Sequence, residues 1–408
     1  MKNRDLYLSS LLDFKDREQV KVITGVRRSG KSTLLTLFKQ HLQKTGVPCG
    51  NIIHLNFESL LHKDLMDGES LWKYVIDRAS NAGRAYVLLD EVQLVTGWER
   101  CVNALRIDCD SDIYITGSNA SLLATHRSSI LGGRCVNIKM LPLSFWEYLD
   151  FNPIDEITDG AMRDFLHLRK FEEYLKFGGM PAIAGQDISS EAANANLLDV
   201  FDAVLARDVI EQNNVRDPAL LRAVAMFLAF NVGSTVSPKK ISDYLTSSGR
   251  KTANETIDNY LKMLTDSFLF YKAQRYDLKG KLFLKTLGKF YIVDTGIRNA
   301  LIGYREADFG HVLENIVFFE LMRTNNAVSI GKQNGYEVDF VADSFDNRKY
   351  YQVAASVLDE NTFKRELRPL ESIKDNYEKT ILTMDRNFTA PINGIRVVNI
   401  VDFLLGGT

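Results

Sequence analysis

Short runs of β-branched and aliphatic residues alternate with helical patterns over residues 1–145. Five of these runs predict strands, at residues 20–24, 51–57, 85–90, 112–117 and 135–140. Strands that alternate with helices are typical of a parallel sheet that is covered by helices. The pattern therefore predicts an α/β domain with a five-stranded parallel sheet over residues 1–145.

The pattern becomes helical after residue 145. Two helices are predicted at 161–176 and 191–213, separated by the turn Gly-Gly-Met-Pro at 178–181. No strand pattern interrupts them. We interpret residues 146–214 as a helical lid that follows the first domain.

Three further helices and two alternating segments follow, a succession that is typical of a winged helix. Together they make residues 215–288 a candidate winged-helix domain. The helices are predicted at 219–231, 238–247 and 253–267, and the alternating segments at 268–274 and 281–287.

The last segment, residues 289–408, mixes one helix with short strands and has no phosphate-binding loop. It is predicted to be a second α/β domain. The helix is predicted at 312–323, and the strands at 328–331, 337–342, 350–354 and 379–383.

A glycine-rich motif, GVRRSGKS, lies between the first predicted strand and a helix predicted at 33–43. Glycines let the backbone N–H groups and the helix N-terminus point at phosphates, and the lysine neutralises phosphate oxygens. The motif therefore predicts that ATP binds here together with Mg²⁺. The candidate nucleotide contacts are Gly25, Val26, Arg27, Arg28, Ser29, Gly30, Lys31, Ser32 and Thr33.

A second motif strengthens this interpretation about 60 residues further on. The apolar run Tyr86 to Leu89 ends in Asp90 and Glu91. We expect Asp90, with the hydroxyl of Ser32, to reach the magnesium ion, and Glu91 to polarise the attacking water. An acid pair at this place indicates hydrolysis as well as binding, whereas an ordinary solvated strand end is the alternative.

Three more residues are candidates for catalysis. Ser118 and Asn119 follow the fourth strand and could sense the γ-phosphate, or they could simply cap a loop. Arg134 precedes the fifth strand, where an arginine could reach the phosphates of a neighbouring subunit or form a surface ion pair. Within the glycine loop, Arg27 and Arg28 either contact phosphate or face the solvent.

Composition places the chain among folded globular proteins, since 45% of its residues are apolar and 25% are charged. Its four cysteines show no CxxC pair or zinc spacing, so they are expected to be reduced thiols. The N-terminus lacks the apolar core of a signal peptide, and the most apolar run, 223–232, is about half of the ~20 residues that a membrane span needs. A cytoplasmic protein without membrane association is expected.

The motifs, taken together, resemble a known group: prokaryotic AAA+ family ATPases, mostly uncharacterised, that carry a C-terminal domain of unknown function. The resemblance covers nearly the whole chain. It rests on GVRRSGKSTLL, NFE (56–58), LLDEVQ, GWE (97–99), TGSNASLL, LGGR, PLSFWEYL, FGGMP, YIVDTGIRNAL, GHVLENIVFFEL, EVDF and YQVA. It implies an ATPase core, a helical lid, a winged helix and a C-terminal domain similar to the restriction-endonuclease core.

A metal-dependent nuclease of that fold needs carboxylates for magnesium and a lysine for the developing charge. Glu314 and Asp339 fit the two carboxylate positions and form a possible second metal site. The acid-x-Lys position, however, holds Gln352 and Ala354. We therefore favour an inactive scaffold over a nuclease, although a lysine elsewhere, Lys332 being nearest to the EVDF strand, could substitute.

Charge is unevenly distributed along the chain. The net charge is −2, but residues 238–289 hold eleven Lys or Arg against five Asp or Glu. Arg250, Lys251 and Asn254 begin the third helix of the candidate winged helix, where a recognition helix presents side chains to double-stranded DNA. Four cations of the predicted hairpin could contact phosphates, namely Lys272, Arg275, Lys279 and Lys281.

The sequence thus predicts an ATPase that couples ATP binding and hydrolysis, with magnesium, to rearrangement of a C-terminal half. That half would bind DNA, a protein partner or a second copy of the chain, because winged helices also serve as protein-binding modules. The alternative is a slow nucleotide-switched DNA-binding or scaffold module. An ATP-gated nuclease is the least favoured possibility.

Overall fold

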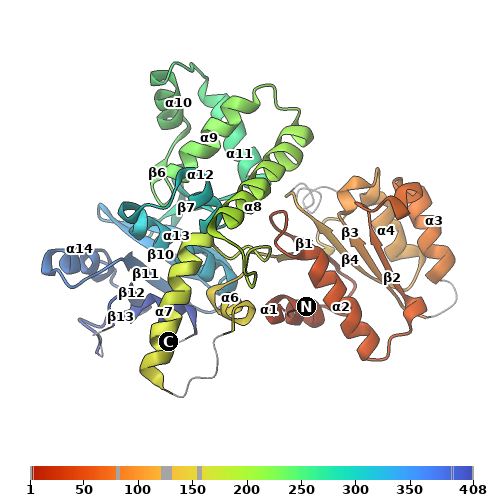
Figure 1. Cartoon of the computed structure of the whole chain (residues 1–408), viewed down its shortest axis with the longest axis horizontal. Helices are drawn as coiled ribbons and strands as arrows, with labels where there is room; N and C mark the ends of the chain where they lie inside the picture. Colours follow the sequence, from red (N-terminus) through yellow and green to blue (C-terminus); the bar gives the residue numbers. More distant parts are fainter. Residues whose placement is uncertain are drawn as a thin grey trace. The chain divides into compact units, whose positions relative to one another are not determined.

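The computed structural model of the chain describes residues 2, 4–79, 83–120, 131–153, 159–386, 388 and 390–406, with residues 285 and 286 described by their backbone alone. The contacts divide the chain into two compact units (Figure 1). The first comprises residues 1–142 with 266–268, and the second comprises 143–265 and 269–408. Each unit is described by itself below.

A five-stranded parallel sheet forms the centre of the first unit, as the sequence predicts. Its strand order is β2-β3-β4-β1-β5. The strands are β1 (Val20–Thr24), β2 (Ile52–Asn56), β3 (Ala85–Asp90), β4 (Ser111–Gly117) and β5 (Cys135–Lys139). The helices are α1 (Asp5–Asp13), α2 (Lys31–Lys44), α3 (Gly68–Ala79) and α4 (Trp98–Asp108), with short 3-10 turns η1 (Cys49–Asn51), η2 (Leu60–Leu65) and η3 (Val92–Leu94).

Helices cover both faces of this sheet, and each face has its own apolar core. Alternate side chains of β3 separate the two: Val87 and Leu89 pack with α3 and α4, whereas Tyr86 and Leu88 pack with α1 and α2. All six residues of β3 are buried, because the strand is covered on both sides. This explains why the strand is an uninterrupted apolar run in the sequence.

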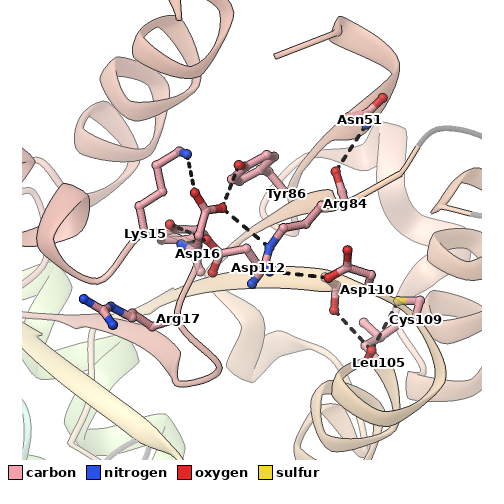
Figure 2. A network of polar contacts seen from close by, with 12 residues as sticks. Lys15, Asp16, Arg17, Asn51, Arg84, Tyr86, Leu105, Cys109, Asp110 and Asp112 are labelled. Carbon is pink, nitrogen blue, oxygen red and sulfur yellow. Dashed lines mark hydrogen bonds and ion pairs between the residues drawn. The ribbon is translucent and has the colours of Figure 1, made fainter. Parts of the chain in front are cut away.

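The amino ends of the strands are held together by a polar network (Figure 2). Lys21 and Asp112 form an ion pair of 2.5 Å between β1 and β4, and both side chains are fully buried. Asp112 also accepts hydrogen bonds from the backbone N–H of Asp16, at 2.8 Å, and from the hydroxyl of Tyr114, at 2.9 Å. Asp16 in turn accepts a bond of 2.7 Å from the hydroxyl of Tyr86. The amino ends of the strands are thus occupied by structural ion pairs and hydrogen bonds. The candidate functional residues lie at the opposite, carboxyl ends of the strands.

The second unit begins with a run of helices. Ser144 and Glu147 form a reciprocal capping box that starts the first of them. The elements are α6 (Phe145–Phe151), α7 (Gly160–Phe177), α8 (Ser190–Ala203), a π-helical stretch η4 (Val204–Glu211), α9 (Pro218–Phe230), α10 (Pro238–Ser247), α11 (Asn254–Asp266), α12 (Thr295–Ile302), η5 (Glu306–Asp308), α13 (Phe309–Thr324), α14 (Glu360–Glu371) and α15 (Ile400–Leu404). Within the described part of the chain, none of the helices is long and apolar enough to cross a membrane.

The helices predicted to form a lid belong to this second unit, where α7 and α8 pack against α12. Two motif residues explain the packing. Asp294 caps α12 and also accepts a 2.7 Å hydrogen bond from the N–H of Gly179, in the turn after α7. Asn299 donates to the carbonyls of Leu175 and Lys176 at the end of α7. The FGGMP and VDTGIRNAL motifs therefore meet in space and hold these helices together.

An eight-stranded sheet completes the second unit, with the order β13-β12-β11-β10-β9-β7-β8-β6. β7 pairs with β8 as an antiparallel hairpin and with β9 in parallel, so one sheet runs through the candidate winged helix and the C-terminal segment. The strands are β6 (Thr235–Val236), β7 (Phe270–Asp277), β8 (Leu282–Ile292), β9 (Ala327–Gln333), β10 (Tyr336–Asp343), β11 (Arg348–Ala354), β12 (Glu378–Thr383) and β13 (Arg396–Asn399).

Candidate functional site

The glycine loop connects β1 to α2 at the carboxyl edge of the first sheet. A Cβ atom on Gly25 would lie 2.1 Å from the carbonyl oxygen of Met140, so only glycine fits there. Gly30 has a φ of +103° and immediately precedes α2, which begins at Lys31. The loop therefore has the strand–loop–helix context that anion binding at a helix N-terminus requires.

Lys31 is the cation of this loop, and its side chain is almost entirely buried. Its ammonium group donates to the carbonyl oxygens of Gly25, at 3.0 Å, and Val26, at 3.2 Å. It also lies 3.8 Å from Oε1 of Glu91. The loop and the end of β3, about 60 residues apart in sequence, thus meet through this one side chain.

Asp90 ends β3 and has a partner on each carboxylate oxygen. Thr116 of β4 donates to Oδ1 at 2.5 Å, and Asn56 of β2 donates to Oδ2 at 3.0 Å. Thr116 also accepts the N–H of Glu91 at 2.9 Å. Because β3 lies between β2 and β4, both neighbouring strands orient this carboxylate.

Glu91 has left-handed backbone torsions, with φ of +55° and ψ of +47°, so the chain leaves the strand conformation directly after Asp90. Burial raises its pKa above the usual range, and the ammonium of Lys31 and a hydrogen bond from Gln93 act against that rise. Gln93 donates to Oε2 at 2.5 Å. The side-chain carbonyl oxygen of Gln93 is buried and has no hydrogen-bond partner among the described residues.

The other loop residues differ in exposure. The hydroxyl of Ser29 is buried and has no hydrogen-bond partner within the described ranges, whereas Ser32 and Thr33 are exposed on the first turn of α2. Arg27 forms an ion pair of 3.1 Å with Glu58, and Arg28 is exposed. Among the described residues, Ser29 therefore offers a buried hydroxyl without a hydrogen-bond partner, and Ser32 offers an exposed one.

The structure brings Ser118 and Asn119 to the same edge of the sheet, but not Arg134. Ser118 and Asn119 follow β4, which lies between β1 and β3, and both are buried. Arg134 is exposed and precedes β5, at the end of that strand where Val20 of β1 pairs with Cys135. The five residues of β1 separate this end from Gly25 by about 17 Å, at ~3.3 Å per residue. Arg134 is therefore at the edge away from the glycine loop of its own chain.

A second group of charged residues lies in the second unit, beside a pocket of about 940 Å³. Glu314 of α13 and Asp339 of β10 both line this pocket. The residue between them is Lys289 of β8, whose ammonium lies 2.7 Å from Glu314, 3.1 Å from Glu337 and 3.4 Å from Asp339. Lys332, the sequence-based candidate, lies in β9 opposite Glu337.

Burial and charge act in opposite directions on this second group. Burial raises the pKa of Asp339 to about 7, against the effect of Lys289, with Glu314 adding to the rise. For Glu314, burial is outweighed by Lys289 and by hydrogen bonds from His311, Lys289 and Tyr291, so that its pKa is lowered. In the part of the chain that is described, no three His, Cys, Asp or Glu residues are arranged to hold a metal ion.

Sequence reasoning assigned no role to several residues of these two groups, among them Thr116, Asn56, Gln93 and Lys289. The first three lie within recognised motifs but had no assigned role, because the neighbours of β3 in the sheet are not visible in the sequence. Lys289 was counted only as one of the basic residues of 238–289. Its position just before the YIVDTG motif was the one available signal.

Comparisons with known proteins agree with this description. Residues 17–149 match the family model of an AAA domain, and residues 168–308 match that of a domain of unknown function. An uncharacterised protein of Haemophilus influenzae is 42% identical over 407 residues, which cover 99% of each chain. An uncharacterised protein of Methanocaldococcus jannaschii is 29% identical over 385 residues, covering 91% of this chain and 82% of that protein.

Among solved structures, a Walker-type ATPase of Pyrococcus abyssi has a similar fold, with a TM-score of 0.52 and 16% identity. The match covers 74% of this chain and 96% of that one. The AAA domain identifies the glycine loop as part of a nucleotide-binding domain. The chain belongs to a family of uncharacterised prokaryotic proteins in which an AAA domain is joined to a C-terminal domain of unknown function.

Proposed function

We propose that the first unit binds ATP at the glycine loop and hydrolyses it. The observation that carries this proposal is the convergence of Lys31, Asp90 and Glu91 at one edge of the sheet, with 3.8 Å between Lys31 and Glu91. A phosphate-binding cation, a carboxylate for the metal and a candidate base are the parts that phosphoryl transfer to water requires.

The phosphates would bind across the N-terminus of α2. There the backbone N–H groups after Gly30 point outward and the helix dipole favours negative charge. The uncommitted hydroxyl of Ser29 is a further donor for a phosphate oxygen. Lys31 would exchange its bonds to the carbonyls of Gly25 and Val26 for the β and γ oxygens.

Ser32 and Asp90 have the chemistry to hold Mg²⁺ beside the phosphates. The hydroxyl of Ser32 is exposed, and a carboxylate such as Asp90 retains acceptor capacity beyond its two hydrogen bonds. Magnesium, when bound with ATP, neutralises the charge that develops on the β and γ oxygens. Thr116 and Asn56 would hold Asp90 in the orientation that this task requires.

Glu91 would accept the proton of the attacking water. Its burial raises its pKa, which brings the carboxylate closer to the proton affinity that a general base needs near neutral pH. The ammonium of Lys31 and the hydrogen bond from Gln93 oppose that rise. Movement of the Lys31 ammonium towards a phosphate would make Glu91 the stronger base at the moment of reaction.

Two substitutions test the assignment. Lys31→Ala should weaken ATP binding, whereas Glu91→Gln should preserve binding and abolish turnover, because only the proton acceptor is lost. Fluorescent-nucleotide titration measures the first effect and phosphate release the second. Normal hydrolysis by Glu91→Gln would show that another group is the base.

A second candidate function is binding of double-stranded DNA by the segment α9 to β8, which we propose is a winged helix. In favour of it, three helices precede the β7–β8 hairpin, and β6 adds a short third strand to that hairpin. Exposed cations lie on the turn before α11 and on the hairpin: Arg250, Lys251, Lys272, Lys279 and Lys281.

The charge on α11 itself indicates which kind of DNA contact to expect. Its exposed face carries Glu255 and Asp258 as well as Lys262, so it offers no net positive charge to the major groove. The cations of the turn and hairpin suit phosphates better than bases. We therefore expect binding that depends strongly on salt and little on sequence.

Electrophoretic shift of a duplex at several salt concentrations tests this proposal. Changing Lys272, Lys279 and Lys281 together to Gln should weaken binding and reduce the salt dependence by about three phosphate contacts. Removing the same charge from exposed positions of the first unit, with Lys44, Lys63 and Lys73→Gln, is the control. Equal loss in both triple variants would indicate only a general charge effect.

ATP turnover with and without duplex DNA distinguishes a DNA-stimulated motor or remodeller from a nucleotide-switched scaffold. A motor or remodeller should turn over faster when DNA is bound. A nucleotide-switched scaffold, the alternative, should hydrolyse slowly and at a constant rate. A protein partner in place of DNA would leave turnover insensitive to DNA but sensitive to that partner.

Arg134 would serve a second copy of the chain, if it serves catalysis at all. It is exposed and lies away from the glycine loop of its own sheet. Mixing Lys31→Ala with Arg134→Ala is the direct test: an arginine that acts in trans should restore part of the turnover in mixed assemblies. Undiminished turnover by Arg134→Ala alone would leave Arg134 as a surface residue.

A further inference from the structure

Lys289 is surrounded by carboxylates on the pocket of the second unit. Its ammonium lies within 3.4 Å of oxygens of Glu314, Glu337 and Asp339. The lysine comes from β8, the first carboxylate from α13 and the other two from β10. Only 5% of Lys289 is exposed, so this is a buried cation with three anionic neighbours.

The carboxylate oxygens have further partners within the protein. Glu314 accepts a 2.6 Å hydrogen bond from the hydroxyl of Tyr291 on the same oxygen that binds Lys289. Asp339 accepts the N–H of Val353 at 3.0 Å with its second oxygen. These bonds fix both carboxylates around the ammonium.

The position that resembles acid-x-Lys contributes neither charge nor an available ligand. Gln352 accepts the N–H of Asp339 with its carbonyl oxygen, at 3.3 Å, so the one atom that could coordinate a metal faces the backbone. Ala354 has no polar side chain. The residues present therefore do not fit the metal-binding arrangement that the resemblance implies, because a lysine already lies among the carboxylates.

We propose that Lys289 is an internal cation that takes the place of a divalent metal ion at this centre. An ammonium and a metal ion compete for the same carboxylate oxygens, and the ammonium is covalently part of the chain, so its effective concentration is high. The centre then holds β8, α13 and β10 together by charge and does not take up a divalent cation. This holds whether or not the first unit hydrolyses ATP.

Removal of Lys289 should allow the carboxylates of this centre to bind a divalent cation. Without Lys289, three carboxylates would share a largely buried site in which, among the described residues, only the imidazole of His311, 3.8 Å from Glu314, is a cationic neighbour, an arrangement that is strongly unfavourable. Oxygen ligands at such a site suit Mn²⁺, which is also a sensitive spectroscopic probe. A neutral residue of similar length in place of Lys289 should therefore create a metal site that the natural protein lacks.

The test is Mn²⁺ binding to the full chain without nucleotide. Binding is measured as the loss of the free-ion signal in electron paramagnetic resonance. Lys289→Met should bind one more Mn²⁺ per chain than the natural protein, with a Kd at this centre at least about 10-fold lower than that of any binding by the natural protein there. Adding Asp339→Asn to Lys289→Met should abolish the gain. Lys374→Met removes an exposed lysine of the same unit and should gain nothing.

Melting temperature gives an independent measure. Mn²⁺ should raise the melting temperature of Lys289→Met and leave that of the natural protein unchanged. A folded Lys289→Met that gains no Mn²⁺ would overturn the proposal. So would Mn²⁺ binding by the natural protein that Asp339→Asn abolishes, and this comparison decides the matter even if Lys289→Met does not fold.

Discussion

The side-chain amide of Gln93 donates a 2.5 Å hydrogen bond to Oε2 of Glu91. The amide nitrogen must face the carboxylate, because the carbonyl oxygen in its place would repel an ionised group. That carbonyl oxygen remains buried without a hydrogen-bond partner among the residues described. Gln93 is thereby placed to orient the carboxylate of the proposed base.

Gln93→Ala should lower kcat by on the order of 100-fold, because the carboxylate of Glu91 loses its fixed orientation. KM for ATP should change little, since Gln93 is not in the glycine loop. The hydrogen bond from Gln93 lowers the pKa of Glu91, so its loss should shift the acidic limb of the pH–rate profile to higher pH. Steady-state kinetics from pH 5 to 9 measures all three effects.

Leu94→Ala is the matched control, because Leu94 is exposed on the same short turn. It should leave both kcat and the pH–rate profile unchanged. An unshifted pH–rate profile in Gln93→Ala would show that Gln93 has only a structural role.

Thr116→Val should impair turnover and stability together. The change keeps the shape of the side chain but leaves the N–H of Glu91 and one oxygen of Asp90 without their shared hydroxyl partner. An unsatisfied buried polar group costs about 1–3 kcal/mol, which urea unfolding can measure. Thr116→Ser retains the hydroxyl and should recover most of the activity; if it is as defective as Thr116→Val, packing rather than hydrogen bonding is responsible.

Breaking the ion pair between Lys21 and Asp112 should strongly destabilise the first unit. Lys21→Met leaves a fully buried carboxylate without its cation, at a cost of about 3–5 kcal/mol. Lys364→Met, which removes an exposed ion pair with Glu360, should cost less than about 1 kcal/mol. A first unit that unfolds at the same urea concentration in Lys21→Met as in the natural protein would contradict the importance of this buried pair.

Asp294 should make the stability of the second unit depend on pH. Burial raises its pKa to about 6, although backbone N–H groups, including those of Gly179 and Ile297, act against the rise. The folded-state pKa thus exceeds the ordinary value of 3.8. The contribution of Asp294 to the free energy of unfolding is therefore fully present below about pH 4 and is lost as pH rises through about 6.

The size of this effect should be roughly 3 kcal/mol at most, from about two pKa units. Asp294→Asn should remove the corresponding slope from a plot of unfolding free energy against pH between 4 and 7. Asp187→Asn changes an exposed carboxylate of the same unit and should keep the slope. A slope that survives in Asp294→Asn would assign the pH dependence to other groups.

Some of these relationships were visible in the sequence and others were not. The strand–loop–helix context of Gly25 to Lys31 and the apolar run before Asp90 are local patterns, and the five predicted strands are all present in the first sheet. The partners of Asp90 were not predictable, because Thr116 and Asn56 become its neighbours only through the strand order β2-β3-β4.

The second unit shows the same limit more strongly. From the sequence, Glu314 and Asp339 were predicted to form a pair on the basis of the resemblance, and Ala354 was seen to stand where a lysine would be expected. It could not identify Lys289 as their partner, because that contact depends on a sheet in which β7 pairs with both β8 and β9. The distance along the chain from Lys289 to Asp339 is 50 residues, and no local pattern spans it.

The sequence by itself determined the glycine loop, the acid pair at the end of β3 and the alternation of strands and helices, because each depends on residues close together in the chain. Only the tertiary structure decided which side chains orient Asp90 and Glu91, and which cation lies among the carboxylates of the second unit. Hydrogen bonds and ion pairs act over about 3–4 Å. Folding alone brings distant residues within that range.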